Sequence, residues 1–164
     1  MAFADDLLQQ ARQLFKLDRR KPKQASLRRA VSTAYYALFH LLVSETVQNW
    51  KRPSERGALA RMFDHARMKK ACTRKRDELS GYLKQLPASD PGRLNVEHLQ
   101  FVAATFIDMQ QDRHTADYDN ATTWTRTDVN EKIESVEEAF ARWAVIRHEP
   151  AAQGFLVTLL IRDR

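Results

Sequence analysis

Apolar residues recur every three or four positions along most of the chain, the period of an amphipathic α-helix. Polar turns and prolines separate five such stretches, which predict helices over about 3–17, 24–51, 54–72, 94–118 and 128–147. A short additional turn is expected at 78–86, after an interruption at 73–77. The apolar run 155–161 is expected to form a terminal helix, because the sequence predicts no strand that could pair with it.

Residues suited to capping helix ends mark two of these boundaries. We expect Ser54 to cap the third helix, and Thr127 or Asp128 to cap the fifth. Five helices with short connections indicate an all-α, up-and-down helical bundle, followed by a short apolar C-terminal segment. A chain of 164 residues is long enough for one domain with a buried core and short for two. We therefore expect a single domain over 1–164, with 149–164 as a C-terminal extension.

The helix predicted over 94–118 has a core-facing stripe that changes character along its length. Its first part is apolar and consists of Val96, Leu99, Val102, Ala103, Phe106 and Ile107. The same stripe continues through a polar set, with a tyrosine beside it, made up of Gln110, Arg113, His114, Asp117 and Tyr118. Charged groups on a core-facing stripe cost free energy unless they are paired or used. This conflict marks the end of the helix as the candidate functional site.

Basic residues are concentrated in the first half of the chain. Residues 1–78 contain 18 Lys and Arg against 8 Asp and Glu, whereas residues 79–164 contain 9 against 13. A basic half could attract the phosphate backbone of a nucleic acid. A solvated basic face opposite an acidic one explains the same numbers equally well. The charge pattern therefore leaves both interpretations open.

Several classes of protein are disfavoured by what the sequence lacks. No apolar run approaches the roughly 20 residues of a membrane helix, and the N-terminus does not resemble a secretory signal. The single cysteine, Cys72, fits a reducing compartment, so we expect a cytoplasmic protein without membrane contact. The five histidines lack metal-site spacing, and the four glycines lie too far apart for a phosphate-binding loop. We expect neither a metal nor a cofactor.

The polar end of the 94–118 helix contains the groups needed for phosphate chemistry. The guanidinium of Arg113 suits phosphate oxygen atoms. Cleaving RNA without a metal requires a group that deprotonates the ribose hydroxyl, one that stabilises the developing charge and one that protonates the leaving oxygen. Arg113 together with His114 or Tyr118 could fill these roles. Alternatively, Arg113 and Asp117 form an ion pair one helical turn apart, and the cluster is purely structural.

Two stretches resemble the HEPN family of helical proteins. The run Ser32-Thr33-Ala34-Tyr35-Tyr36-Ala37-Leu38-Phe39-His40 is similar to the Ser-x-x-Tyr-Tyr-Ala-x-Phe-His pattern of the second helix of many bacterial members. The run Arg113-His114-Thr115-Ala116-Asp117-Tyr118 is similar to a branch in which Arg is followed shortly by Ala-Asp-Tyr. In the ribonuclease motif of the family, a histidine follows the arginine after four to six intervening residues, and this chain has Tyr118 at that place.

The resemblance implies a helical bundle that forms a homodimer, with the Arg-containing helices of both protomers lining one cleft. Many such proteins are metal-independent endoribonucleases of toxin–antitoxin or defence systems, and others bind RNA, a nucleotide or a partner nucleotidyltransferase. In similar toxin–antitoxin members the partner modifies a tyrosine near this arginine, which would make Tyr118 a regulatory target.

These considerations assign two groups of site residues. The candidate catalytic residues are Arg113, His114 and Tyr118. The candidate substrate-binding residues are Asp117, Gln110, Arg28 and Arg29. The alternative is a non-catalytic helical interaction module, which binds a partner protein such as a nucleotidyltransferase through the apolar segment 155–161.

Overall fold

The computed structural model describes residues 2–162, and these form helices joined by turns and short loops. The elements in chain order are α1 (Ala2–Lys16), α2 (Gln24–Val47), the 3₁₀ turn η1 (Pro53–Glu55), α3 (Arg56–Ala60), α4 (His65–Gln85), α5 (Arg93–Tyr118), α6 (Arg126–Ile146) and α7 (Pro150–Thr158). No strand occurs within this part of the chain, so the prediction of an all-α fold is confirmed. None of the described helices combines the length and the apolar character needed to cross a bilayer.

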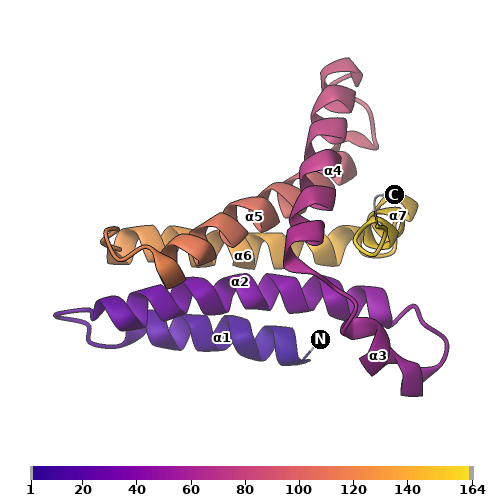
Figure 1. Cartoon of the computed structure of the whole chain (residues 1–164). Helices are drawn as coiled ribbons and strands as arrows, with labels where there is room; N and C mark the ends of the chain where they lie inside the picture. Colours follow the sequence, from indigo (N-terminus) through magenta and orange to yellow (C-terminus); the bar gives the residue numbers. More distant parts are fainter. Residues whose placement is uncertain (1, 163–164) are drawn as a thin grey trace.

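Four long helices, α1, α2, α5 and α6, form the packed body of the molecule (Figure 1). The central element is α2, which packs against the other three. Its inward-facing side chains are almost completely buried, among them Leu27, Val31, Ala34, Tyr35, Leu38 and Leu42. Each large apolar side chain buried in this way contributes about 1.5–3 kcal/mol to stability. The large number of buried positions in α2 therefore reflects a helix with neighbours on several sides.

The C-terminal part of α4 and the N-terminal part of α5 project together from the body of the molecule as a hairpin (Figure 1). Only Met68, Cys72 and Leu79 of α4 are buried. The predicted interruption at 73–77 is wrong, because α4 continues without a break from His65 to Gln85. This basic run consists mostly of helix-compatible residues, and the buried positions on both sides of it keep the helix packed against α5.

Two helix starts differ from the sequence prediction. Ser54 lies in the 3₁₀ turn η1 and caps nothing, whereas Asp64 caps α4 by accepting a hydrogen bond from the backbone N–H of Arg67 at 2.9 Å. The helix α6 is capped by Thr125, which exchanges hydrogen bonds with Asp128 in a capping box. The prediction that Thr127 or Asp128 caps this helix is therefore wrong by two or three residues. Asp128 still contributes to the cap, from within the first turn of α6.

The expected C-terminal helix forms as α7 (Pro150–Thr158), which begins before the predicted run 155–161 and ends three residues short of it. One face of this segment packs on the body of the molecule. Phe155, Leu156 and Leu159 are buried, whereas Val157 and Ile161 on the opposite face are each 59% exposed. The predicted apolar segment is therefore divided between the protein's own core and its surface.

Candidate functional site

Arg113 lies on the last turns of α5 and faces α2. Its side chain is 15% exposed, and the guanidinium carbon lies 5.2 Å from the centroid of the Tyr35 ring and 5.9 Å from that of Tyr36. These distances correspond to cation–π contacts. No hydrogen bond among residues 2–162 involves this guanidinium, and its Nε atom is buried without a partner. The cation is thus held mainly by aromatic faces.

The ion pair expected between Arg113 and Asp117 is long. The Nη1 atom of Arg113 lies 4.0 Å from the Oδ2 atom of Asp117, too far for a hydrogen bond. The same Oδ2 atom accepts a hydrogen bond of 3.3 Å from the hydroxyl of Ser32, a buried residue of α2. Asp117 is therefore positioned by α2, and it neutralises Arg113 only in part.

His65, the first residue of α4, belongs to the same cluster and was not predicted from the sequence. Its Nδ1 atom lies 2.6 Å from the hydroxyl oxygen of Tyr35, and its ring stacks on Phe39 with centroids 4.2 Å apart. Burial lowers the pKa of His65, and the positive charge of Arg113 lowers it further. The imidazole is therefore neutral at pH 7. The sequence signal for this histidine is Asp64, a residue suited to capping a helix, which would have marked His65 as the first residue of α4.

The contact between Tyr35 and His65 determines which groups the cluster offers to a ligand. Burial raises the pKa of Tyr35, so its phenol remains protonated. We assign this O–H as the donor to Nδ1 of the neutral imidazole, which places the ring proton of His65 on Nε2. Arg113 and the Nε2 atom of His65 are then N–H donors, and Asp117 is the acceptor beside Arg113. An arrangement dominated by donors suits an anionic ligand.

Arg28 and Arg29, which were assigned to substrate binding, lie near the start of α2. The guanidinium of Arg28 donates hydrogen bonds to the backbone carbonyls of Ala116 at 2.9 Å, Asp119 at 2.8 Å and Thr122. These bonds satisfy carbonyl groups at and just beyond the C-terminal end of α5, where no helical partner exists. Arg28 therefore fixes the end of the helix that carries the site. Arg29 is exposed to solvent.

The remaining predicted site residues separate into a buried and an exposed group. Gln110 is buried, and its Oε1 atom has no partner among the described residues. His114 and Tyr118 are exposed, with ring centroids 5.0 Å apart and a Tyr118 exposure of 67%. The expectation that His114 continues the core stripe is wrong, because the buried side of α5 passes through Met109, Gln110 and Ala116.

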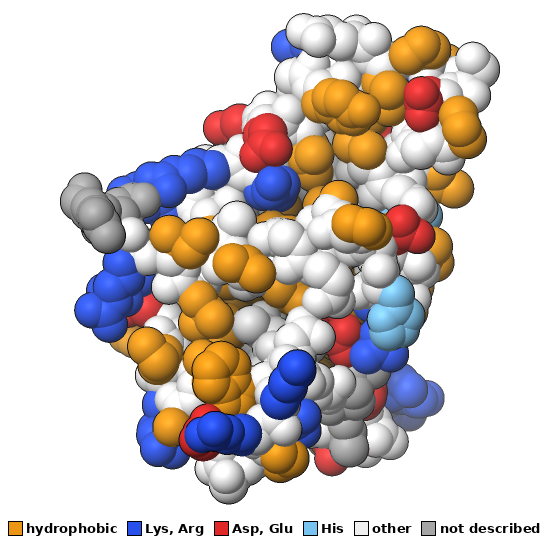
Figure 2. All heavy atoms as spheres, turned by 90° about the vertical axis from the view of Figure 1, so that its right-hand side faces the viewer, with side chains coloured by type: hydrophobic (Ala, Val, Ile, Leu, Met, Phe, Trp, Pro, Cys, Tyr) orange, Lys and Arg blue, Asp and Glu red, His pale blue; other side chains and the backbone are white. Residues whose placement is uncertain are grey.

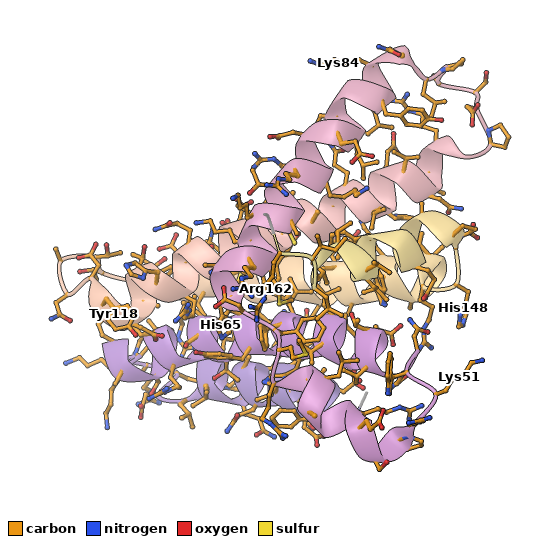
Figure 3. All side chains as sticks on the ribbon, turned by 45° about the vertical axis from the view of Figure 1, so that its right-hand side comes forward. Lys51, His65, Lys84, Tyr118, His148 and Arg162 are labelled. Atoms are coloured by element: carbon orange, nitrogen blue, oxygen red, sulfur yellow. The ribbon has the colours of Figure 1, made fainter. Side chains whose placement is uncertain are left out.

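The labelled side chains in Figure 3 show how far this separation extends. Tyr118 lies at the end of α5, whereas His65 lies where α4 begins beside α2, nearer the middle of the molecule. The structure thus places Arg113 with His65 on the inner side of α5, and His114 with Tyr118 on its outer side. The predicted catalytic set is not brought together within one chain.

Within residues 2–162 no group of three or more His, Cys, Asp or Glu side chains could hold a metal ion. Comparison of the chain with family models, with curated protein sequences and with solved structures gave no match. The HEPN resemblance therefore depends on the runs 32–40 and 113–118. These two runs meet in the fold through the Ser32–Asp117 hydrogen bond and the packing of Arg113 on Tyr35 and Tyr36.

Proposed function

We propose that this chain is a HEPN-like protein that binds RNA or a nucleotide through the side chains around Arg113. The observation that carries the proposal is the guanidinium of Arg113, which is largely buried and makes no hydrogen bond among residues 2–162. Keeping such a cation from water costs free energy unless anionic oxygen atoms approach it. A phosphate group matches this requirement, because a guanidinium can donate two parallel hydrogen bonds to it.

The proposal includes a homodimer in which the α5 helices of two protomers line one cleft, as the resemblance implies. His114 and Tyr118 lie on the outer side of α5, where they would face the second protomer. In this arrangement they would transfer protons to RNA held at Arg113, as in a metal-independent endoribonuclease of a toxin–antitoxin or defence system. Sedimentation equilibrium tests the dimer, and a monomer at micromolar concentration contradicts this part of the proposal.

The binding experiment compares wild-type protein with Arg113→Ala in the presence of EDTA. We expect the substitution to weaken RNA binding roughly tenfold or more, because a hydrogen bond to a charged group contributes about 1.5–3 kcal/mol. Arg52→Ala is the matched control, since Arg52 is an exposed arginine paired only with the nearby Glu55 among the described residues. RNA cleavage is followed in the same samples. Equal binding by wild type and Arg113→Ala would contradict the proposal.

An apolar groove favours the alternative, a non-catalytic module that docks a partner protein. The groove has a volume of about 560 Å³ and is lined by Trp50 and Leu59 together with Leu156, Val157 and Leu160 of the C-terminal segment. Orange side chains mark this apolar region on the face shown in Figure 2. The alternative gains support if Arg113→Ala and Asp117→Ala each lower the free energy of unfolding by several kcal/mol and leave RNA binding unchanged.

A further inference from the structure

Basic residues without partners are concentrated at one end of the molecule, around the turn between α1 and α2. Figure 1 shows this turn and the loop between α5 and α6 at the same end, where Gln24 of α2 bonds to Trp124 of that loop. The exposed cations here form what we call the basic end, namely Lys16, Arg19, Arg20, Lys21, Lys23 and Arg29. None of their side chains forms a hydrogen bond or an ion pair within residues 2–162.

The turn between α1 and α2 holds its cations on a defined backbone. Asp18 has a φ of 52°, the left-handed conformation that commonly ends a helix. The backbone N–H of Lys21 donates a hydrogen bond of 3.0 Å to the carbonyl of Asp18, so Arg19 and Arg20 are the two central residues of a hydrogen-bonded turn. Pro22 then restricts the backbone just ahead of α2. The turn therefore presents these side chains to solvent at fixed positions.

Carboxylates balance the positive charge of the basic end only in part. Those at this end of the molecule are Asp18, Asp117, Asp119 and Asp128. The last three accept hydrogen bonds from Ser32, Thr122 and Thr125. The six cations have no such bonds, so they remain available to an anion from outside the chain.

The accessible side of α2 leads from the basic end to Arg113. Beyond Arg29, the residues of α2 that are not buried recur at helical spacing and form one line, made up of Tyr36, His40, Ser44 and Val47. Arg29 and Tyr36 are seven residues apart, so they point in nearly the same direction and lie about 10 Å apart along the helix axis. The guanidinium carbon of Arg113 lies 5.9 Å from the centroid of the Tyr36 ring. Arg29 therefore lies between the turn and Arg113.

The partly exposed ring of Tyr36 indicates which anion fits this line. Single-stranded nucleic acids bind where cations follow the backbone and aromatic rings stack on the bases. The cations of the basic end, Arg29 and Tyr36 provide both features in sequence along α2. An acidic peptide would pair with the cations but has no base to stack on the ring.

We propose that the basic end binds phosphate groups of a single-stranded RNA that runs along the accessible side of α2 to Arg113. The inference rests on the proposed function and extends it, because the ligand is then a strand rather than a mononucleotide. Lys23 and Tyr36 are thirteen residues, or about 20 Å, apart along α2. Three stacked nucleotides span only about 10 Å, at roughly 3.4 Å each, so a strand must be longer to reach both places.

The test compares Arg19→Gln/Lys21→Gln/Lys23→Gln with wild type, by fluorescence anisotropy of labelled single-stranded RNA of three and twelve nucleotides in EDTA. The matched control is Arg61→Gln/Lys51→Gln/Lys84→Gln, which removes the same residue types from exposed positions. Figure 3 shows Lys51 and Lys84 far from Tyr118, which marks the end of α5 beside the basic end. All six side chains lack partners among the described residues, so both variants should keep the stability of wild type.

We expect the basic-end variant to bind the twelve-nucleotide RNA at least tenfold more weakly, and the control to bind it nearly as wild type does. The slope of log affinity against log salt should become shallower by about 2, because some three phosphate contacts are lost at roughly 0.7 each. The three-nucleotide RNA should lose much less affinity, because it reaches only one of the two places. Arg29→Gln alone should also weaken binding of the longer RNA, and an unchanged affinity in this variant would exclude the path along α2.

Other outcomes separate this inference from the proposed function. Equal losses in the basic-end variant and the control overturn the inference, because net charge then explains them. Equal losses for both RNA lengths, or competition by poly-glutamate as strong as that by RNA, overturn the strand. Weakened binding by Arg113→Ala, with wild-type affinity in the basic-end variant, overturns this inference alone. Unchanged binding by Arg113→Ala contradicts the proposed function and the path to Arg113, and absence of RNA binding by wild type contradicts both proposals.

Discussion

At the scale of single residues, two partly buried arginines of this protein have opposite surroundings. Arg147 donates two hydrogen bonds, of 2.7 and 3.1 Å, to the carboxylate of the buried Glu45. Arg113 has aromatic rings beneath it and a carboxylate oxygen 4.0 Å away. The first arrangement satisfies the cation within the fold, whereas the second leaves the guanidinium of Arg113 without a hydrogen bond among residues 2–162.

The difference predicts opposite effects on stability. Arg147→Ala should lower the free energy of unfolding by about 3–5 kcal/mol, because it leaves the carboxylate of Glu45 buried and unpaired. Arg113→Leu should change it by less than about 1 kcal/mol or increase it, because functional residues often reduce stability. Chemical denaturation of both variants checks the comparison. A loss of several kcal/mol in Arg113→Leu would indicate a structural role.

At the scale of elements, the end of α5 is positioned by α2. Arg28 binds three backbone carbonyls at this end, and Gln24 exchanges hydrogen bonds of 2.7 and 2.9 Å with the backbone of Trp124 in the following loop. Both residues lie in the first turns of α2. The orientation of Asp117 and Arg113 therefore depends on side chains roughly ninety positions earlier in the chain.

We expect Arg28→Ala to loosen the end of α5. It removes charge-assisted hydrogen bonds, which contribute about 1.5–3 kcal/mol when donor or acceptor is charged. The free energy of unfolding should fall by an amount in this range, and the amides of the last turn of α5 should exchange with solvent faster. Arg29→Ala, at the neighbouring exposed position, is the matched control and should leave both quantities unchanged. Hydrogen exchange read by NMR separates a local effect from global unfolding.

At the scale of the whole molecule, the projecting α4–α5 hairpin joins the body through α5 and through the contact of His65 with Tyr35. This contact depends on protonation, because the neutral imidazole accepts a hydrogen bond at Nδ1. Arg113 disfavours a positive charge at this position. The junction between hairpin and body is therefore sensitive to pH.

Acidification should destabilise the protein. Folding lowers the pKa of His65, and that of His40 through burial, so the unfolded chain takes up protons first as the pH falls below about 6.5. The free energy of unfolding should be highest above this pH. It should decrease as the pH falls from there toward the lower pKa values that His65 and His40 have in the folded state. His65→Asn should reduce the decline between pH 7.5 and 5.5, leaving the contribution of His40. Chemical denaturation at pH 7.5 and pH 5.5 measures the decrease in the free energy of unfolding. If the decrease is the same in the variant as in wild type, His65 does not contribute to it.

The sequence by itself determined the helical class and the limits of α5, but it placed the end of α2 four residues too late and joined α3 and the start of α4 into one helix. The helix over 94–118 was placed within one residue of the observed Arg93–Tyr118, because amphipathic periodicity is a property of neighbouring residues. The same periodicity identified Arg113 as a cation at the end of a core stripe. It failed at 73–77, where a run of charges was interpreted as a break although the flanking buried residues keep α4 continuous.

Only the tertiary structure decided which residues accompany Arg113. Tyr35 and His65 join it from two other helices, Arg28 is used to fix the end of α5, and His114 faces outward. The path from the basic end to Arg113 likewise depends on α5, which brings Arg113 over Tyr36 of α2. Such contacts depend on how helices cross and on which face each one buries. Periodicity along one helix contains no information about its neighbours, so these groupings could not be read from the sequence.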